Sequence, residues 1–195
     1  MFCCLLVALF LISIQPDLGT SLALVFIFVA MLFMAAVPVK ILAGISAAGV
    51  APVPLLYADL FEYQRMRLVA FFQGTQAQLH FIPEQHTDFI FSVLGEELGL
   101  IGALLLLLVY LLLIYRILHI GSVAADSFGA LLCVGVAAMI AFQVIVNIGI
   151  NIGLIPVTGL PLPFFSYGGN SILVKLVSVG IVLNVGMRRK KALFT

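Results

Sequence analysis

Asp88 is the residue whose type and setting in this sequence best suit catalysis. It ends a polar segment, residues 73–88, and the apolar run that begins Phe89-Ile90-Phe91 follows at once. In the first turn of a helix, the helix dipole and the free backbone N–H groups stabilise a carboxylate in its ionised form. Such a group can act as a general base or bind a cation. The alternative is that Asp88, or Thr87, is only the residue that caps the helix.

Two further carboxylates, Glu96 and Glu97, follow Asp88 in the same apolar run. On a continuous helix both lie roughly 12–14 Å along the axis from Asp88, and their faces differ by about 100°. Gly95 and Gly99 share the face of Asp88, which another helix or a lipid chain can approach closely. Carboxylates inside a membrane are costly and usually face a wet cavity or a bundle interior. Each glutamate is therefore a candidate for binding substrate, with a role in helix packing as the alternative.

The segment 156–171 contains three prolines and three glycines, yet it is too apolar for an ordinary solvated loop. Non-helical backbone near membrane depth is tolerated only where protein buries it or where it lines a cavity. We therefore predict that this segment dips back into the bundle. Asn147 and Asn151, four apart on one helix face, either hydrogen-bond its carbonyls or simply join helices. Its candidate substrate-binding residues are Ser166, Tyr167, Gly168, Gly169 and Ser171.

Lys175 lies about 6 Å from Ser171 along the last predicted helix. An ammonium group at that depth must extend outward to the membrane surface or find an anion. The anion can be a phosphate of the substrate or the carboxylate of Glu97. Lys175 is therefore a further candidate for binding substrate.

His80, Glu84 and His86 lie close to Asp88 in the sequence, which raises the question of a metal site. Their spacing matches no helical zinc motif such as HExxH, so we expect no dedicated zinc site. A divalent cation, Mg²⁺ or Mn²⁺, held loosely by the carboxylates is compatible with these residues.

The composition indicates which kind of protein positions these groups. Of the 195 residues, 64% are hydrophobic and 9% are charged, whereas about 25% are charged in a soluble domain. A spanning helix needs about 20 mainly apolar residues. We predict an all-α polytopic transmembrane helix bundle that forms one membrane domain, residues 1–195. The expected membrane segments are about 1–14, 20–37, 40–58, 89–115, 128–155 and 171–187, and the outer loops are 59–88 and 156–170.

The distribution of positive charge predicts the orientation. Lys40, Arg116 and the basic tail at 188–191 fall on one side of the membrane, and only Arg65 and Arg67 fall on the other. The side richer in lysine and arginine is the cytoplasmic one, so both polar segments face away from the cytoplasm. A net charge of +1, with no basic cluster besides the tail, gives no electrostatic footprint for nucleic acid.

Three segments, as they stand, resemble motifs of the SEDS (shape, elongation, division, sporulation) family of peptidoglycan polymerases. They are QPDLGT at 15–20, GTQAQLHFIPEQHTDFIFSVLGEELGLIG at 74–102 and NIGLIPVTGLPLPFFSYGGNS at 151–171. Their length and order make the resemblance specific, and the GTQ at 74–76 is more similar to the RodA branch than to the FtsW branch. The resemblance covers the whole chain but only the second half of a ten-helix fold. It also implies that a stretch of the large outer loop is missing between Phe72 and Gln73.

The resemblance implies a metal-dependent glycosyltransferase that polymerises lipid II at the outer face of the membrane during cell elongation and cell-shape maintenance. The aspartate of the family's HTDFIF motif is regarded as catalytic, and it corresponds to Asp88. Its implied role is to deprotonate or orient the 4-hydroxyl of the acceptor sugar. A class B penicillin-binding protein and membrane lipid are the implied partners. Because the missing stretch would shape the substrate cleft, the shortened chain can be inactive alone.

Two other functions compete with this one. A flippase for a lipid-linked precursor would also use Glu96, Glu97 and a broken segment near the bilayer. A non-catalytic membrane partner would only dock a class B penicillin-binding protein. Formation of glycan from purified lipid II distinguishes a polymerase from both alternatives, because neither transport nor docking makes a polymer. Docking of the partner would also be unchanged when Asp88 is replaced.

Overall fold

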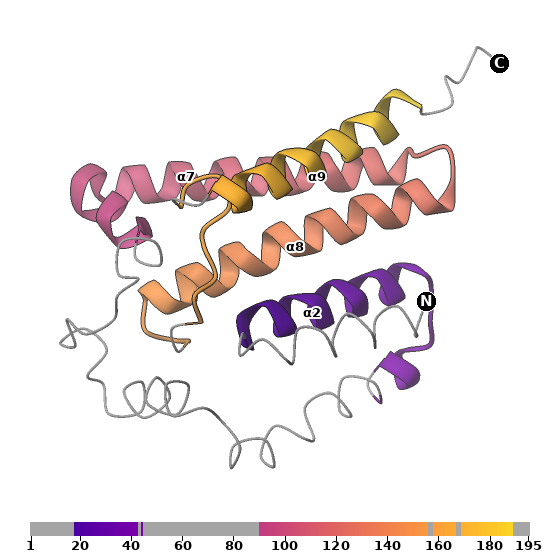
Figure 1. The fold of residues 1–195 in the computed structure, drawn as a ribbon, viewed down its shortest axis with the longest axis horizontal. Coiled ribbons are helices and arrows are strands. Elements are labelled where there is room, and N and C mark those ends of the chain that lie inside the picture. Colours follow the sequence, from indigo (N-terminus) through magenta and orange to yellow (C-terminus); the bar gives the residue numbers. More distant parts are fainter. Residues whose placement is uncertain (1–17, 43, 45–89, 156–157, 167–168, 189–195) are drawn as a thin grey trace.

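A computed structural model describes the greater part of the chain, and the described part is entirely helical and contains no strand (Figure 1). The described residues are 18–42, 44, 90–155, 158–166 and 169–188. Their helices are α2 (Leu18–Met34), α7 (Ile90–Ser122), α8 (Ser127–Asn151) and α9 (Gly169–Met187). The predicted all-α class is confirmed. The expected segment 1–14 and most of 40–58 lie outside the described residues.

Three of these helices are long and apolar enough to cross a membrane: α7 with 33 residues, α8 with 25 and α9 with 19. The helix ends differ from the predicted ones. α7 continues to Ser122 rather than ending at 115, because no glycine or proline interrupts it near Arg116 and the exposed arginine tolerates a helical position. α8 ends at Asn151 rather than 155, because Gly153 adopts a positive φ of 74° that ordinary helix cannot contain.

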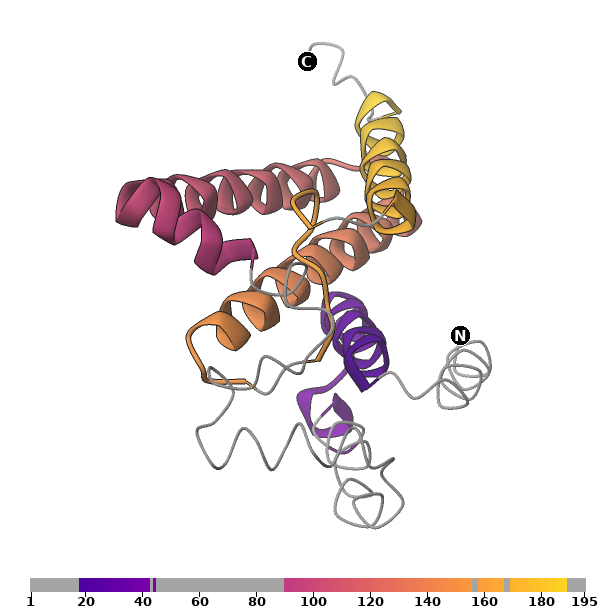
Figure 2. The same cartoon turned by 60° about the vertical axis from the view of Figure 1, so that its left-hand side comes forward.

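α8 lies at the centre of the described structure, with α2, α7 and α9 packed against it (Figures 1 and 2). Half of its membrane-length window is buried, against 11% in α7 and in α9. Small residues allow the close approach. A Cβ added to Gly121 of α7 would lie 2.9 Å from the Cβ of Cys133 of α8, and one added to Gly135 would lie 3.3 Å from the sulfur of Met31 of α2. Helices in membranes associate through such small-residue contacts.

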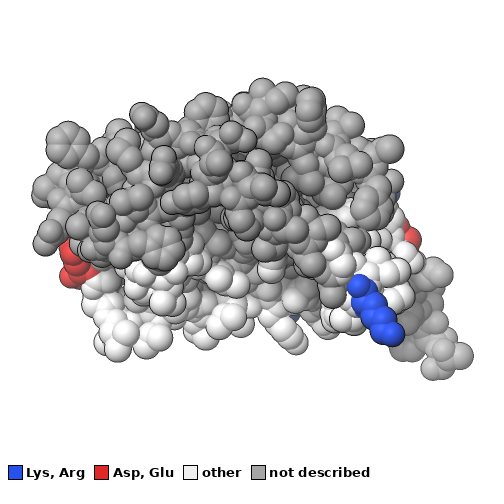
Figure 3. Space-filling view, turned by 90° about the horizontal axis from the view of Figure 1, so that it is seen from below, with Lys and Arg blue, Asp and Glu red and all other residues white. Residues whose placement is uncertain are grey.

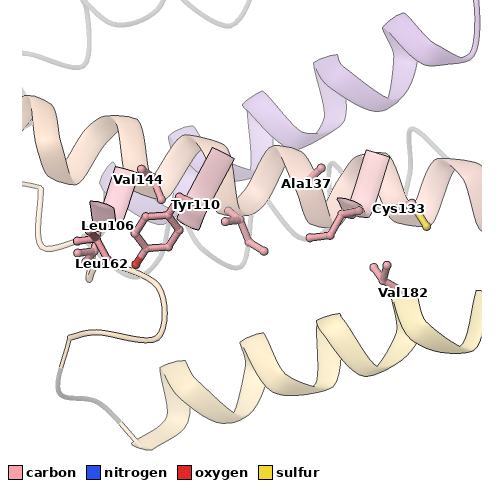
Figure 4. Close-up of a cluster of buried hydrophobic side chains, with 9 residues drawn as sticks. Leu106, Tyr110, Cys133, Ala137, Val144, Leu162 and Val182 are labelled. Carbon is pink, nitrogen blue, oxygen red and sulfur yellow. The ribbon is translucent and has the colours of Figure 1, made fainter. Parts of the chain in front are cut away.

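The main hydrophobic cluster joins three helices and one non-helical segment (Figure 4). Its buried members are Leu106, Tyr110 and Ile117 of α7; Cys133, Ala137, Ile140 and Val144 of α8; Val182 of α9; and Leu162 of the non-helical segment. Leu162 is not in a helix, yet it is 1% exposed. The segment around it is therefore part of the core and not an external loop.

Apart from the buried Lys175, the charged groups seen on the described surface lie toward the ends of the bundle (Figure 3). In the face shown in Figure 3, the visible described surface between the two ends is almost entirely uncharged. Asp126 begins α8 as its N-cap, and its carboxylate accepts a hydrogen bond of 3.2 Å from the Gly129 amide. Such a distribution suits helices whose middle sections lie in hydrocarbon.

We expect Gly121→Ala to lower the melting temperature of the purified protein in detergent. The added methyl would force α7 away from Cys133, and overpacking of this kind costs about 1–3 kcal/mol. Gly95→Ala on the same helix is the matched control, because a Cβ there meets nothing within 4 Å. Cys133→Gly should cost less stability in the Gly121→Ala chain than in the parent, because the two changes act on one contact. Equal melting of the two alanine variants would contradict the proposed α7–α8 contact.

Candidate functional site

Several of the predicted site residues lie outside the described part of the chain. They are Asp88, Tyr167 and Gly168, together with His80, Glu84 and His86. The described part of α7 begins at Ile90, two residues after Asp88. The predicted position of Asp88 in the first turn of a helix stays a prediction, and the site is built here from the groups around it.

The start of α7 is tied to the end of α8 by Ser92 and Asn151. The Oδ1 of Asn151 accepts hydrogen bonds from the Ser92 amide at 3.1 Å and from the Ser92 hydroxyl at 2.7 Å. The Nδ2 of Asn151 donates to the backbone carbonyl of Asn147 at 2.7 Å. Asn151 therefore joins two helices, which is one of the two roles that the sequence left open for it. Ser92 lies four residues after Asp88 in the sequence, so this link anchors the helix that follows the candidate base.

The segment 158–166 passes back into the bundle, as the sequence analysis predicted. Leu160, Leu162 and Ser166 are each 1–2% exposed. The Nδ2 of Asn147 donates to the carbonyl of Leu160 at 3.1 Å, which is the loop-binding role that the sequence allowed for this asparagine. The hydroxyl of Tyr110 on α7 donates to the carbonyl of Pro163. Side chains of α7 and α8 thus donate hydrogen bonds to carbonyl groups of this segment, which forms no helix that could pair them.

Ser166 uses its side chain to hold the same segment. Its Oγ accepts a hydrogen bond of 2.8 Å from the amide of Leu162. Of the other candidates in this region, Gly169 is the first residue of α9 and is exposed, and Ser171 is half-buried. The structure therefore gives Ser166 an internal structural bond, whereas Gly169 and Ser171 lie at the outer start of α9.

Lys175 lies almost wholly inside the protein, with 5% of its surface exposed. Its Nζ donates to the Oγ of Ser171, one helical turn closer to the outer end of α9, at 2.7 Å. Lys175 makes no ion pair within the described ranges. Glu97, the carboxylate considered as its partner, is exposed on α7 and forms no ion pair with it. The ammonium has three N–H donors and uses one of them here. A buried cation in this state favours binding of an anion.

Glu96 and Glu97 are both exposed in the described structure, and the helix that carries them is not continuous. α7 breaks at Gly99, whose φ of 65° and ψ of −164° are not helical, and Figure 2 shows the first part of α7 turning away from the rest. The expectation of one continuous helix through this region was therefore wrong. Glycine accepts this backbone without steric cost. Gly102 is also needed, because a Cβ there would lie 2.3 Å from the Cβ of Leu98.

The described residues contain no group of three His, Cys, Asp or Glu side chains that could hold a metal ion. They therefore supply no geometry for the divalent cation considered from the sequence.

Sequence reasoning missed Tyr110, which fixes the loop from α7. The available signal was a lone tyrosine in the middle of the aliphatic run at 103–114. A buried tyrosine usually finds a hydrogen-bond partner for its hydroxyl.

Asn147→Leu is expected to destabilise the fold, because it leaves the carbonyl of Leu160 buried without its donor, at a cost of about 1–3 kcal/mol. Gln143→Leu is the matched control on the same helix. Gln143 is also buried, but its Oε1 has no hydrogen-bond partner among the described residues, so its loss should be neutral or stabilising. Thermal melting in detergent measures both. A similar fall in both variants would argue against a specific role for Asn147.

Comparison with known proteins places this arrangement in a family. The model of the FtsW, RodA and SpoVE family of cell cycle proteins matches residues 1–75 and 69–191. The two matched pieces meet where the sequence analysis placed the missing loop stretch, between Phe72 and Gln73.

Named relatives cover most of the chain. Peptidoglycan glycosyltransferase MrdB of Escherichia coli is 37% identical over 213 residues, covering 92% of this chain and 57% of its own length. The probable peptidoglycan glycosyltransferase FtsW of Geobacter metallireducens is 36% identical over 208 residues, covering 90% of this chain and 55% of its own length. The chain thus spans a little over half the length of these relatives.

Solved structures resemble the described fold closely. A peptidoglycan synthase complex that coordinates polymerization and crosslinking contains a chain that superposes with a TM-score of 0.82 and 34% identity, covering 96% of this chain and 60% of that chain. The rod shape determining protein RodA of Thermus thermophilus gives a TM-score of 0.72 and 33% identity, covering 96% of this chain and 55% of that chain. The resemblance seen in the sequence motifs is confirmed: the chain belongs to the FtsW, RodA and SpoVE family and is a multi-pass protein of the bacterial cytoplasmic membrane.

Proposed function

We propose that this chain forms the outward-facing site of a peptidoglycan glycosyltransferase that polymerises lipid II during cell elongation and cell-shape maintenance. The observation that carries the proposal is the match to relatives named peptidoglycan glycosyltransferases over 90% or more of the chain. The aligned share is large enough to take in the outer segments that hold Asp88 and the buried loop. A precursor flippase gains no support of its own, since Glu96 and Glu97 are exposed in the described structure.

The proposed reaction joins two lipid-linked sugars. The 4-hydroxyl oxygen of the acceptor sugar attacks C1 of the donor sugar, and the bond from C1 to the diphosphate breaks. The acceptor's proton passes to the carboxylate of Asp88, and the diphosphate leaves with the bonding electron pair on its lipid carrier. General bases of this kind contribute about 10²–10⁴-fold to the rate.

We assign the negatively charged diphosphate to Lys175. The ammonium is buried, points toward the outer start of α9, and keeps donors beyond the one given to Ser171. Fixed positive charge in a site from which water is excluded stabilises a departing anion strongly. Gly169 and Ser171, at the start of the same helix, belong to this proposed subsite. Ser166, Tyr167 and Gly168 would shape it from the preceding segment.

Two further components belong to the proposal. A divalent cation, when bound, would neutralise negative charge on the diphosphate. A class B penicillin-binding protein is the proposed partner, supported by the likeness to a chain from a complex that couples polymerization and crosslinking.

The first test replaces Asp88. A chimera that joins the first half of E. coli MrdB to this chain, with the outer-loop stretch of MrdB inserted between Phe72 and Gln73, should polymerise purified lipid II. In this chimera Asp88→Asn should lower the rate by about 10²–10⁴-fold. Asparagine caps a helix about as well as aspartate, so the melting temperature should not change. Unimpaired polymerisation by Asp88→Asn, with loss of folding in Asp88→Ala, would show that Asp88 is only a cap. A parental chimera that folds but makes no glycan would refute the proposed activity.

The second test concerns Lys175 in the same chimera. Lys175→Met keeps an unbranched side chain one atom shorter and removes the charge. The melting temperature should therefore stay level or rise, because a buried charge is costly. The KM for lipid II should rise by about 10- to 100-fold, as expected for loss of a hydrogen bond from a charged group. Lys175→Arg is the control that retains the charge. A lower melting temperature with an unchanged KM would indicate a purely structural lysine.

A further inference from the structure

A cavity of about 420 Å³ lies between α8 and α9 at the end of the bundle opposite the loop 158–166. We call it the inner-end cavity. Its lining residues are Asp126, Phe128, Gly129, Leu132, Val177, Gly180, Ile181, Asn184, Val185 and Arg188. It shares no residue with the proposed catalytic site. The distribution of lysine and arginine places this end on the cytoplasmic side of the membrane.

The walls of the inner-end cavity are apolar and its entrance is polar. Five aliphatic or aromatic side chains line it, and the polar groups Asp126, Asn184 and Arg188 lie at the ends of their helices. Along α9 and the residue that follows it, the lining runs from Val177 to Arg188, a rise of eleven steps or about 16 Å. The hydrocarbon of one leaflet is about 15 Å thick. The cavity therefore extends from the inner membrane surface to about the middle of the bilayer, which suits one acyl chain.

Gly180 leaves the space open. A Cβ built on Gly180 meets no atom within 4 Å, whereas one built on Gly129 would lie 3.0 Å from Val185. Gly129 therefore allows α8 and α9 to pack closely at the back of the cavity. Gly180 leaves open the side of the cavity that faces the lipid. Ile181, Asn184 and Arg188 are exposed along the same side, so a lipid chain has access from the membrane.

The charges at the entrance favour an anionic headgroup. Arg188 is exposed at the end of α9, and the sequence continues with Arg189, Lys190 and Lys191. Asp126 is the one carboxylate in the lining, and it is engaged with the Gly129 amide at the start of α8. Basic pockets between helices on the cytoplasmic side are typical sites for anionic lipid headgroups.

We infer that the inner-end cavity binds an anionic phospholipid of the cytoplasmic leaflet, with one acyl chain between α8 and α9 and its phosphate at Arg188. This site is independent of the proposed glycosyl transfer. Its ligand is a structural lipid, held by apolar contact along the cavity and by charge at the entrance.

The test uses the purified full chain in detergent with equal amounts of phosphatidylglycerol and phosphatidylcholine, and native mass spectrometry counts the bound lipid. The parent should retain phosphatidylglycerol in preference to phosphatidylcholine. Arg188→Gln should reduce that preference by about fivefold, the effect expected for one basic residue at a membrane surface. Arg116→Gln removes an equal charge from the same side, outside the cavity, and should not change it.

A second pair of variants fills the cavity without changing charge. Gly180→Leu should abolish retention of both lipids, because its side chain enters the open space, and Gly95→Leu should not. Leucine favours a helix over glycine, so melting should not fall; if it does, Gly180→Ala tests the same space with one methyl group. Retention unchanged in both Gly180 variants, or an equal loss in Arg188→Gln and Arg116→Gln, would overturn the inference. A dimer that Gly180→Leu dissociates would assign the cavity to a second copy of the chain instead.

Discussion

The structure depends on one constraint: the backbone of residues 158–166 lies inside a membrane bundle without forming a helix. Each unpaired peptide group there would cost several kcal/mol, because hydrocarbon offers no hydrogen bonds. Donors from α7 and α8 meet this need, through the Tyr110 hydroxyl at Pro163 and the Asn147 amide at Leu160. Ser166 adds an internal bond to Leu162. The polar residues at the outer half of the bundle are therefore arranged around the loop.

The same bonds position the candidate site. α8 contributes Asn147 to the loop and Asn151 to Ser92, and the two asparagines are themselves hydrogen-bonded. One short stretch of α8 thus holds the loop that leads into α9 and the start of the helix that follows Asp88. A shift of either element would have to break its bonds to α8. This rigidity is what glycosyl transfer demands, since a base and a bound diphosphate must keep a fixed separation.

The sequence was sufficient to predict the helical class and the re-entrant segment, because each rests on the cost of burying polar groups in hydrocarbon. For Asn147 it left two roles open, and the bond to the Leu160 carbonyl is seen only in the structure. It was not sufficient for α7, where we predicted a continuous helix. Glycine at 99 is tolerated in a helix as well as in a break, and periodicity does not distinguish the two. The break became evident only from the backbone angles of Gly99. The environment of Lys175 was also open, because burial depends on neighbours from other helices.

The position of Lys175 agrees with the diphosphate-binding role proposed for it. Its Cα lies six residues, or about 9 Å, below the start of α9, which is inside the hydrocarbon region. The side chain extends back toward Ser171, so the charge lies about one turn nearer the surface than the backbone that carries it. Protein covers the ammonium there and keeps water from weakening its charge. A lipid diphosphate bound at that depth would keep its carrier in the bilayer and its sugars outside, on the side where the sequence places Asp88.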